Sequence, residues 1–497
     1  MKGFRRERRR FSELPAVSLR PVRLAWALVL LLTAFGGCAG FGGVGKLTGG
    51  RSDLPQLEVT LPQEIGLPEE NKPLPENPTL QDYLAYAALH NPGLQAAFEA
   101  WKAALWKIPQ VRSLPDPRFT YAYLVERVET RVGPQRQRFA LAQTFPWLSR
   151  LELQEDVAFQ EAQAKRAFYE SAKWSLFERV KKAYYEYAYL RQAVAVTEEN
   201  IRLLRNLERV FQTRYAGFLA PYGALVRIQT ELGRLEDRLK TLEDLRHPAS
   251  EELNAALNRP EKALLPWPPP SRVTTVALSD EAARAWLLAD NPELKALSSL
   301  VAKEQAGEKL AQKSYFPDVM VSLEAVDTGE AMNRATPDSG KDPVAVGISI
   351  NLPIWWQKYE AGVQEARHRE RAAAKTLAER QNALSARLAM TLYKLRDAER
   401  RIDLYRNGLI PKARQALQVS LQDFEAGLGG YLDVIDAQRM LLEFELAHER
   451  AEADKAQRLA EVEGLVGRFL EEVPAESDEM ASGRSGARRP NPQNDGG

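Results

Sequence analysis

The chain has 497 residues, of which 44% are hydrophobic and 27% charged, and its 68 basic and 67 acidic residues leave a formal net charge of +1. A balance so close to neutral provides no general attraction for nucleic acid, so no nucleic-acid partner is expected. Outside the N-terminus there is no run of about 18 apolar residues, which argues against a helical membrane protein. The single cysteine excludes an internal disulfide and a cysteine-based metal site.

The N-terminus predicts secretion and lipidation. Arginines precede an apolar stretch at 24–35, which is too short for a membrane helix and is typical of a signal peptide. The stretch ends in Phe35-Gly36-Gly37-Cys38, which resembles the lipobox of bacterial lipoproteins. This resemblance implies a signal peptide at 1–37, a covalent lipid on Cys38 as the only attached group, and an outer-membrane destination, because Ala39 rather than Asp follows the cysteine. Residues 38–78 then form an extended, proline-rich linker.

Two similar halves follow. Asn91-Pro92 recurs as Asn291-Pro292, an offset of 291 minus 91, or 200 residues, and Pro115-Asp116 recurs as Pro317-Asp318. A period this long exceeds that of solenoid repeats, so it predicts one structural unit used twice, at 79–259 and 280–471. A proline-rich linker at 260–279 joins the units, and the polar tail at 472–497 is predicted to be disordered.

Each half is predicted to begin with two helices and continue into a β-hairpin. The second helix starts at Asn-Pro and ends near Leu114. Hairpins are predicted at about 118–145 and 318–352, with loops at 127–135 and 327–342, because apolar residues alternate there with small or polar ones. Strands of about ten residues suit a tilted crossing of a bilayer. The alternative is a small soluble hairpin packed on helices.

Each hairpin leads into a very long helical segment. Pro146 and Pro353 mark the two strand-to-helix junctions, since proline removes a donor from the strand ladder. Helical patterns at 148–220 and 357–424 return along 225–257 and 432–470, with Pro411 as an expected kink. A helix of that length would reach roughly 100 Å. Such segments predict coiled-coil hairpins at about 148–257 and 357–470.

Two hairpins that each lead into a coiled-coil hairpin, duplicated in one chain, resemble the TolC family over about residues 79–470. The resemblance implies a mainly α protein with a β-barrel portion, in which a homotrimer completes a 12-stranded barrel from four transmembrane strands per chain. It implies a lipid-anchored channel in the outer membrane that extends into the periplasm, where it meets a periplasmic adaptor protein and an inner-membrane pump. Four strands alone cannot close a membrane barrel, which agrees with this arithmetic.

A pore gate is the sharpest site expectation. Asp433 and Asp436 match the family's Asp-x-x-Asp at the periplasmic entrance, and a spacing of three puts both carboxylates on one helix face. Three copies would form a ring that favours cations. The first half has Ala224 and Arg227 at the matching positions, so it adds nothing to the ring. The alternative is two solvated aspartates after a turn.

The helical tips are expected to dock the adaptor, on the resemblance alone. The tip residues singled out are Tyr215, Gly217, Tyr222, Phe424, Gly427 and Tyr431. Phe424 and Gly429 stand where the founding member has a latching tyrosine and arginine, so that latch is not expected here.

No enzyme and no metal site are expected, since no nucleophile, base and orienting group can be assembled and the four histidines lack ligand spacing. Two other classes stay open: a periplasmic coiled-coil adaptor, and a structural envelope lipoprotein that does not conduct. The transported substrate is not predicted.

Overall fold

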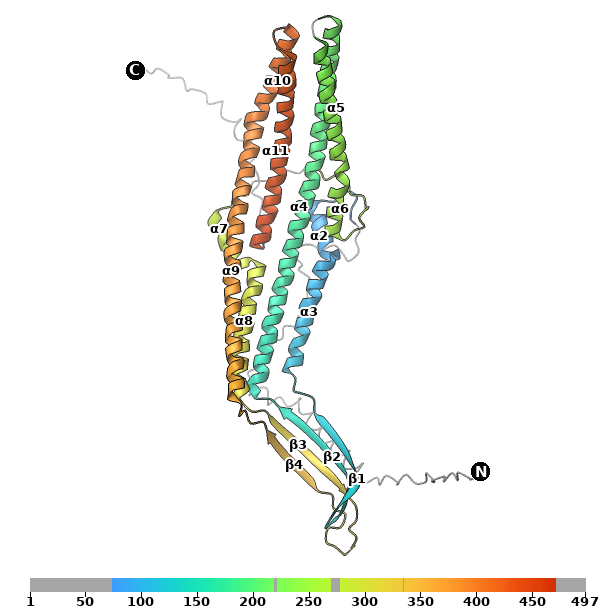
Figure 1. Ribbon diagram of the computed structural model, residues 1–497, viewed down its shortest axis with the longest axis vertical. Helices are drawn as coiled ribbons and strands as arrows, with labels where there is room; N and C mark the ends of the chain where they lie inside the picture. The colour runs from blue at the N-terminus through green and yellow to red at the C-terminus, as the bar shows by residue number, and fades with distance from the viewer. Residues whose placement is uncertain (1–73, 219–220, 270–277, 334, 471–497) are drawn as a thin grey trace, which may run out of the picture. The chain divides into compact units, whose positions relative to one another are not determined.

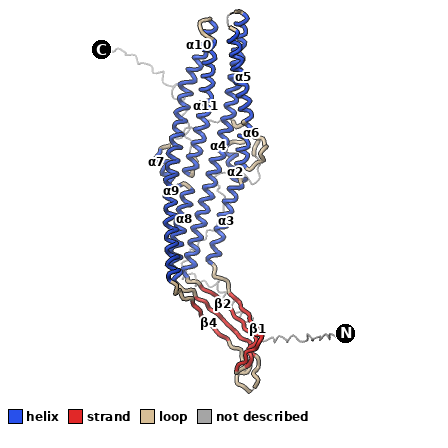
Figure 2. Tube along the Cα trace, viewed as in Figure 1, coloured by secondary structure: helices blue, strands red, loops and turns tan. Residues whose placement is uncertain are grey.

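The computed structural model describes residues 74–218, 221–269, 278–333 and 335–470. Within these ranges, each pair of β-strands is preceded and followed by helices along the chain (Figure 1). Far more residues are helical than are in strands (Figure 2). The predicted signal peptide at 1–37, the lipidation residue Cys38 and the predicted tail at 472–497 lie outside the described residues, as does most of the linker at 38–78. None of the described helices has both the length and the apolar composition needed to cross a membrane.

The strands form one antiparallel sheet in the order β1-β2-β3-β4. Their bounds are β1 (Arg118–Thr130), β2 (Gly133–Phe145), β3 (Val319–Thr328) and β4 (Val344–Ile350). The first loop is far shorter than the predicted 127–135, because the ladder resumes after an irregularity in β1 and continues through Val128↔Gln135 to Thr130↔Gly133. The second loop is long, at 329–343, close to the predicted 327–342.

Strand register places apolar side chains of all four strands on one face. Phe119 pairs with Leu141, Leu141 with Leu323, and Leu323 with Val346, so these four residues form one row across the sheet. The opposite face carries small and polar residues and an ion pair between Arg138 and Glu324 at 3.0 Å. The division into an apolar face and a small or polar face is therefore confirmed, and the apolar face extends to both edge strands.

The first half contains five helices among its described residues. They are α2 (Leu80–His90), α3 (Pro92–Arg112), α4 (Leu148–Ala216), α5 (Tyr222–Asp244) and α6 (Arg246–Leu257). The 69 residues of α4 are continuous. The returning helix, predicted as one segment, is split at Leu245, because Pro248 has no N–H to donate to the carbonyl of Asp244.

The second half has a similar order, but its outgoing long helix is interrupted and its returning helix is unbroken. Its elements are α7 (Asp280–Asp290), α8 (Pro292–Gln312), the short 3₁₀ helix η3 (Lys313–Tyr315), α9 (Trp356–Asp403), the π-helix η4 (Leu404–Leu409), α10 (Ile410–Ala426) and α11 (Tyr431–Val466). Pro411 cannot donate to Asn407, and the widened turn of η4 directly before it lets Ile410 donate to Tyr405 instead. The kink expected at Pro411 is thus a π-helical turn.

The repeated Asn-Pro pairs perform the same task in both halves. Asn91 accepts a hydrogen bond from Leu94 N at 3.1 Å and donates to Ala256 O at 3.0 Å. Asn291 accepts from Leu294 N at 2.9 Å and donates to Leu465 O at 2.8 Å. Each buried amide therefore begins one helix while it holds the end of another, α6 or α11.

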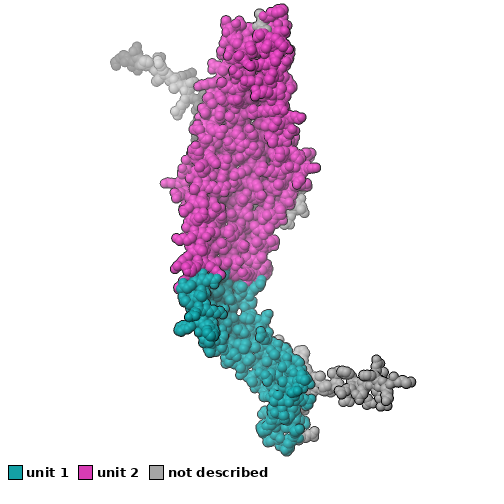
Figure 3. Space-filling model, in the orientation of Figure 1, with its two compact units in different colours: residues 1–60, 108–157, 306–366 teal, residues 61–107, 158–305, 367–497 magenta. Residues whose placement is uncertain are grey.

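The chain divides into two compact units (Figure 3). One contains the sheet and the helix ends next to it, at 108–157 and 306–366, and the other contains residues 61–107, 158–305 and 367–497. In this second unit, α4, α5, α10 and α11 bury a shared apolar core that includes Phe211, Ile228, Phe424 and Ile435.

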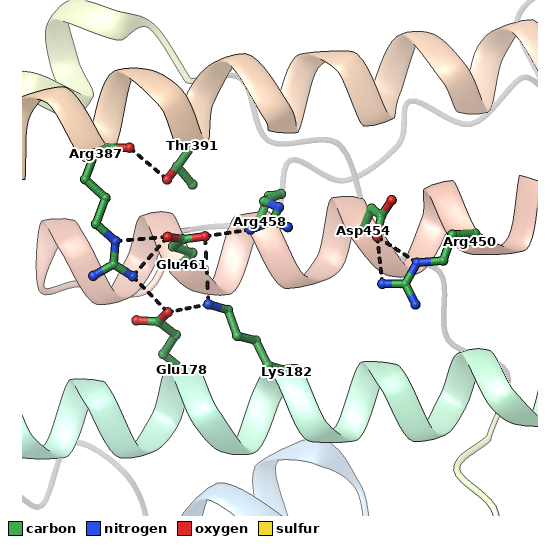
Figure 4. A network of polar contacts seen from close by, with 8 residues as sticks. All are labelled: Glu178, Lys182, Arg387, Thr391, Arg450, Asp454, Arg458 and Glu461. Carbon is green, nitrogen blue, oxygen red and sulfur yellow. Dashed lines mark hydrogen bonds and ion pairs between the residues drawn. The ribbon is translucent and has the colours of Figure 1, made fainter. Parts of the chain in front are cut away.

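An ionic network also joins the two halves within this helical unit. Glu461 on α11 accepts from Arg387 on α9 at 3.0 Å and from Arg458 at 2.9 Å, and Lys182 on α4 lies 3.8 Å away (Figure 4). Burial alone would raise the pKa of the Glu461 carboxyl, but these cations outweigh it and hold the pKa below its usual range. Gly464 leaves the space that Glu178 occupies, since a Cβ there would lie 2.9 Å from a Glu178 oxygen.

Candidate functional site: the tips of the coiled-coil hairpins

The first tip joins α4 to α5 through aromatic residues. Tyr215 and Tyr222 are exposed and their rings lie 5.5 Å apart. Gly217 N donates to Thr213 O at 3.1 Å and ends the helix. The next residue, Phe218, has a φ of +58°, a backbone region that is unfavourable for a bulky residue. Its apolar ring is also 98% exposed to water. Sequence reasoning did not single out Phe218.

The second tip is shaped by glycine. Gly427 ends α10 with a φ of +77°, a left-handed conformation that glycine adopts without steric cost. Tyr431 is half-buried against the four-helix core. Phe424 is buried and stacks on Phe211 of α4, with ring centroids 4.4 Å apart, so its ring lies inside the chain rather than on the surface of the tip.

Arg214 of the first tip forms hydrogen bonds with the second tip. Its guanidinium lies 5.0 Å from the centre of the Phe424 ring and donates to the carbonyls of Phe424, at 2.5 Å, and of Glu425. These carbonyls belong to the last turn of α10, where the helix leaves acceptors without partners and a cation is favoured. Arg214 was not predicted as a site residue, because its partners are about 210 residues away in the sequence.

The two predicted gate aspartates have different surroundings. Asp433 accepts a hydrogen bond from Gly430 N at 3.1 Å and so caps the start of α11. Asp436 is exposed, at 69% of its side chain, and one of its oxygens lies 3.5 Å from Nη1 of Arg439. The carboxylates therefore share the first turns of α11, as their spacing predicted, but one is committed to a cap and the other has a cationic neighbour.

Arg439 connects this turn to the first hairpin. Its Nε donates to Glu231 Oε2 at 3.0 Å, and Nη2 donates to the other oxygen. This two-point bond with Arg439 holds the pKa of the buried Glu231 carboxyl below its usual range, and the pKa of Arg439 is raised. Next to it, Gln438 on α11 donates to Asn200 on α4 at 3.0 Å. The two returning helices, α5 and α11, are thus joined by a charged pair.

Comparison with known proteins identifies this arrangement. Residues 285–468 match the profile of the family described as "Outer membrane efflux protein". This part of the chain is therefore an outer membrane efflux protein region. The matched region contains most of α7, all of α8 to α11, and the strands β3 and β4.

Individual relatives are distant. An uncharacterised protein of Haemophilus influenzae is 25% identical over 352 residues, which cover 68% of this chain and 76% of the relative. "Toxin and drug export protein A" of Aggregatibacter actinomycetemcomitans is 26% identical over 200 residues, 40% of this chain and 43% of the relative. The crystal structure of the outer membrane protein VceC of Vibrio cholerae superposes with a TM-score of 0.65 at 19% identity, covering 79% of this chain and 97% of that one.

This match, together with the likeness to solved outer-membrane proteins, assigns the chain to the cell outer membrane and to transport rather than catalysis. Its fold, with long α-helices and a small antiparallel sheet, is that of the TolC-like channels, as the sequence predicted.

The strand-to-helix junctions of this chain are stabilised by a polar and an aromatic contact. Directly after Pro146, Trp147 stacks on Phe316 at 4.9 Å, and Arg150 lies 3.3 Å from Asp318, the residue that follows Pro317. Asn351, just before Leu352 and Pro353, accepts a hydrogen bond from Asp318 N. Both junctions predicted from proline are therefore held next to the start of β3.

Proposed function

We propose that the chain is the outer-membrane channel of a tripartite efflux or export system and that it works as a homotrimer. The observation that carries the proposal is the sheet. It has four strands, its outermost strands β1 and β4 each have an unpaired edge, and one continuous face is apolar. Open edges are not tolerated in lipid, because every backbone donor and acceptor needs a partner there.

In an assembly of three copies, both edges of each sheet can find a pairing partner. If β4 of one copy pairs with β1 of the next, three sheets of four strands close a barrel of twelve strands, within the usual range for outer-membrane barrels. The apolar row through Leu141, Leu323 and Val346 then faces lipid, and the face with Arg138 and Glu324 lines the lumen. Covalent lipid on Cys38 would add a second attachment to the same membrane.

The helical tips supply the gate and the docking surface in this proposal. Asp433 and Asp436 of three copies would form a ring of carboxylates around the pore axis, which attracts cations. Arg439 reduces the negative potential next to Asp436 and ties α11 to α5, so it would keep the tip narrow while the pair with Glu231 is intact. A periplasmic adaptor would dock on the exposed tip residues, including Tyr215, Tyr222 and Gly427, and would link the channel to an inner-membrane pump.

The experiment is conductance of the purified protein in planar bilayers. We expect heat-resistant trimers in outer-membrane fractions and single-channel currents from them. Exclusive recovery of monomer from the periplasm would contradict the channel and favour a periplasmic adaptor. Trimers in the outer membrane without conductance would favour a structural lipoprotein.

The same bilayers test the gate residues. Replacing both aspartates with alanine, D433A/D436A, is expected to reduce cation selectivity, because the ring of carboxylates is lost. The measurement is the reversal potential in a salt gradient, with D423A as the matched control on the end of α10. Unchanged reversal potentials in D433A/D436A would remove both residues from the gate.

A further inference from the structure

A band of aromatic and basic side chains lies where the strands meet the helices, and nothing proposed above uses it. We call this band the junction collar. Its members lie between β2 and α4, in and directly after η3, and at or just before the start of α9, all within the unit that contains the sheet. They are Trp147, Lys313, Tyr315, Phe316, Trp355, Trp356, Lys358 and Tyr359.

Ring contacts form two clusters in the collar, which meet in the chain at the adjacent residues Tyr315 and Phe316. Phe316 stacks on Trp147, and the ammonium of Lys313 lies 5.2 Å from the centre of the Phe316 ring. The neighbouring residue Tyr315 contacts Tyr359 at 5.6 Å between ring centroids. Each lysine is therefore beside a ring that is itself packed on another ring. The second lysine repeats the arrangement, with Lys358 lying 5.8 Å from the centre of the Tyr359 ring.

The charges of the collar leave these two ammonium groups available. Asp318 pairs with Arg150, and Glu360 accepts a hydrogen bond from the Tyr315 hydroxyl at 3.2 Å. Neither Lys313 nor Lys358 forms an ion pair within the part of the chain that the structure describes. An ammonium over a ring face keeps further N–H donors for an anion.

The collar also continues the apolar face of the sheet. Exposed apolar residues run from Val344 through Ile350 to Leu352 and Ile354, and Trp355 and Trp356 follow at 72% and 75% exposure. Tryptophan and tyrosine gather where a membrane protein passes from hydrocarbon to headgroups. Two adjacent, exposed tryptophans directly after an apolar strand therefore indicate the headgroup level of the bilayer.

From this geometry we infer that the junction collar binds anionic phospholipid headgroups in the leaflet next to the helices, with Lys313 and Lys358 bonding the lipid phosphate and Trp355 and Trp356 at the same depth. The inference rests on the proposed function, because it requires the sheet to be in the membrane. A lysine near an anionic lipid surface contributes enough attraction for about a fivefold preference.

The test uses the full-length protein in nanodiscs made of phosphatidylcholine with a minor fraction of phosphatidylglycerol. Native mass spectrometry counts the lipids that stay bound to the trimer. We expect wild type to retain phosphatidylglycerol in preference to phosphatidylcholine. In K313Q/K358Q the ratio of the two retained lipids should fall by about fivefold for each lysine replaced. K313R/K358R is expected to keep it, as is K240Q/K412Q, the control pair of exposed lysines on α5 and α10.

Depth is measured separately, by tryptophan quenching with lipids brominated close to the headgroup or near the end of the chain. Wild type should lose more fluorescence to the shallow bromine than W355F/W356F does. An unchanged preference in K313Q/K358Q, or equal quenching in both proteins, would overturn the inference while the trimer still inserts. A chain that does not insert as a trimer into pure phosphatidylcholine discs would instead overturn the proposed function, and the inference with it.

Discussion

Arg439 forms ion pairs with two acidic residues of different burial. Glu231 is buried and receives two hydrogen bonds from it, whereas Asp436 is exposed and lies at the edge of contact. A buried, two-point pair is strongly coupled, and removal of one partner leaves the other charge without compensation. Under the proposed function, Glu231 and Arg439 would hold the tip closed within one copy, while the more exposed Asp436 would face the pore.

We expect E231Q to open the tip. The amide cannot balance Arg439, so α11 loses its charged bond to α5, and single-channel conductance at pH 7 should rise by severalfold over wild type. The charge-reversed double variant E231R/R439E should restore wild-type conductance, and E236Q, at an exposed carboxylate of α5, should leave it unchanged. Equal conductance of E231Q and wild type would show that the pair does not restrain the tip.

The same pair gives a pH dependence whose sign follows from the lowered pKa of Glu231. A carboxyl with a folded pKa below its unfolded value, about 4.3, stabilises the closed tip above that value and loses the contribution as the pH falls through the folded pKa. Wild type should therefore remain in its low-conductance state at mildly acidic pH and open only in stronger acid, whereas E231Q should show no such transition.

Sequence alone could locate Asp433 and Asp436, because a spacing of three on a helix is a local property. It could not pair Glu231 with Arg439 or Arg214 with the end of α10, since those contacts depend on how two hairpins about 210 residues apart are aligned. It also treated Phe424 as part of the tip surface, although alignment with α4 buries the ring against Phe211.

At the scale of elements, the two Asn-Pro junctions and the π-helix show how far pattern reasoning extends. The repeated Asn-Pro located the starts of α3 and α8 correctly, yet the second bond of each amide, to the end of α6 or α11, is a tertiary contact. Pro411 indicated an interruption but not its form. The split at Leu245 was missed because Pro248 lies inside an otherwise continuous apolar pattern.

Replacing either junction amide should destabilise the helical unit. N91A or N291A removes a helix cap and leaves a buried carbonyl without its donor, so the free energy of unfolding should fall by about 2 kcal/mol. Urea titration of the helical circular dichroism signal measures this change. N206A, at an exposed position on α4, should change it by less than about 0.5 kcal/mol. Similar values for N291A and N206A would mean that water replaces the lost bonds.

At the scale of the whole molecule, the sheet is the part that, under the proposed trimer, one copy does not complete. Its two faces were predictable from period-two patterning, because alternation is encoded in each strand. The pairing of β2 with β3, which joins the two hairpins into one sheet, was not predictable from either hairpin alone.

Two adjacent residues of β4 provide a matched test of which face meets lipid. Ile348 lies on the apolar face and Ser349 on the opposite one. I348R should cost about 2–4 kcal/mol if it places a charge in the bilayer, whereas S349R should be tolerated in an aqueous lumen. The yield of heat-resistant trimer in outer-membrane fractions distinguishes them. Equal losses in both variants would contradict the assignment of faces.

The unpaired edges of β1 and β4 have a genetic consequence, which concerns cells that make intact and mutant copies together. Under the proposed assembly, each copy completes its neighbours' hydrogen bonding on both sides, so a copy with a damaged edge strand leaves a gap that two sound copies cannot fill. A gene encoding such a copy would inactivate the mixed trimers and act dominantly over the intact gene. A change confined to the helical interior of one copy would leave the edges of the other two copies paired.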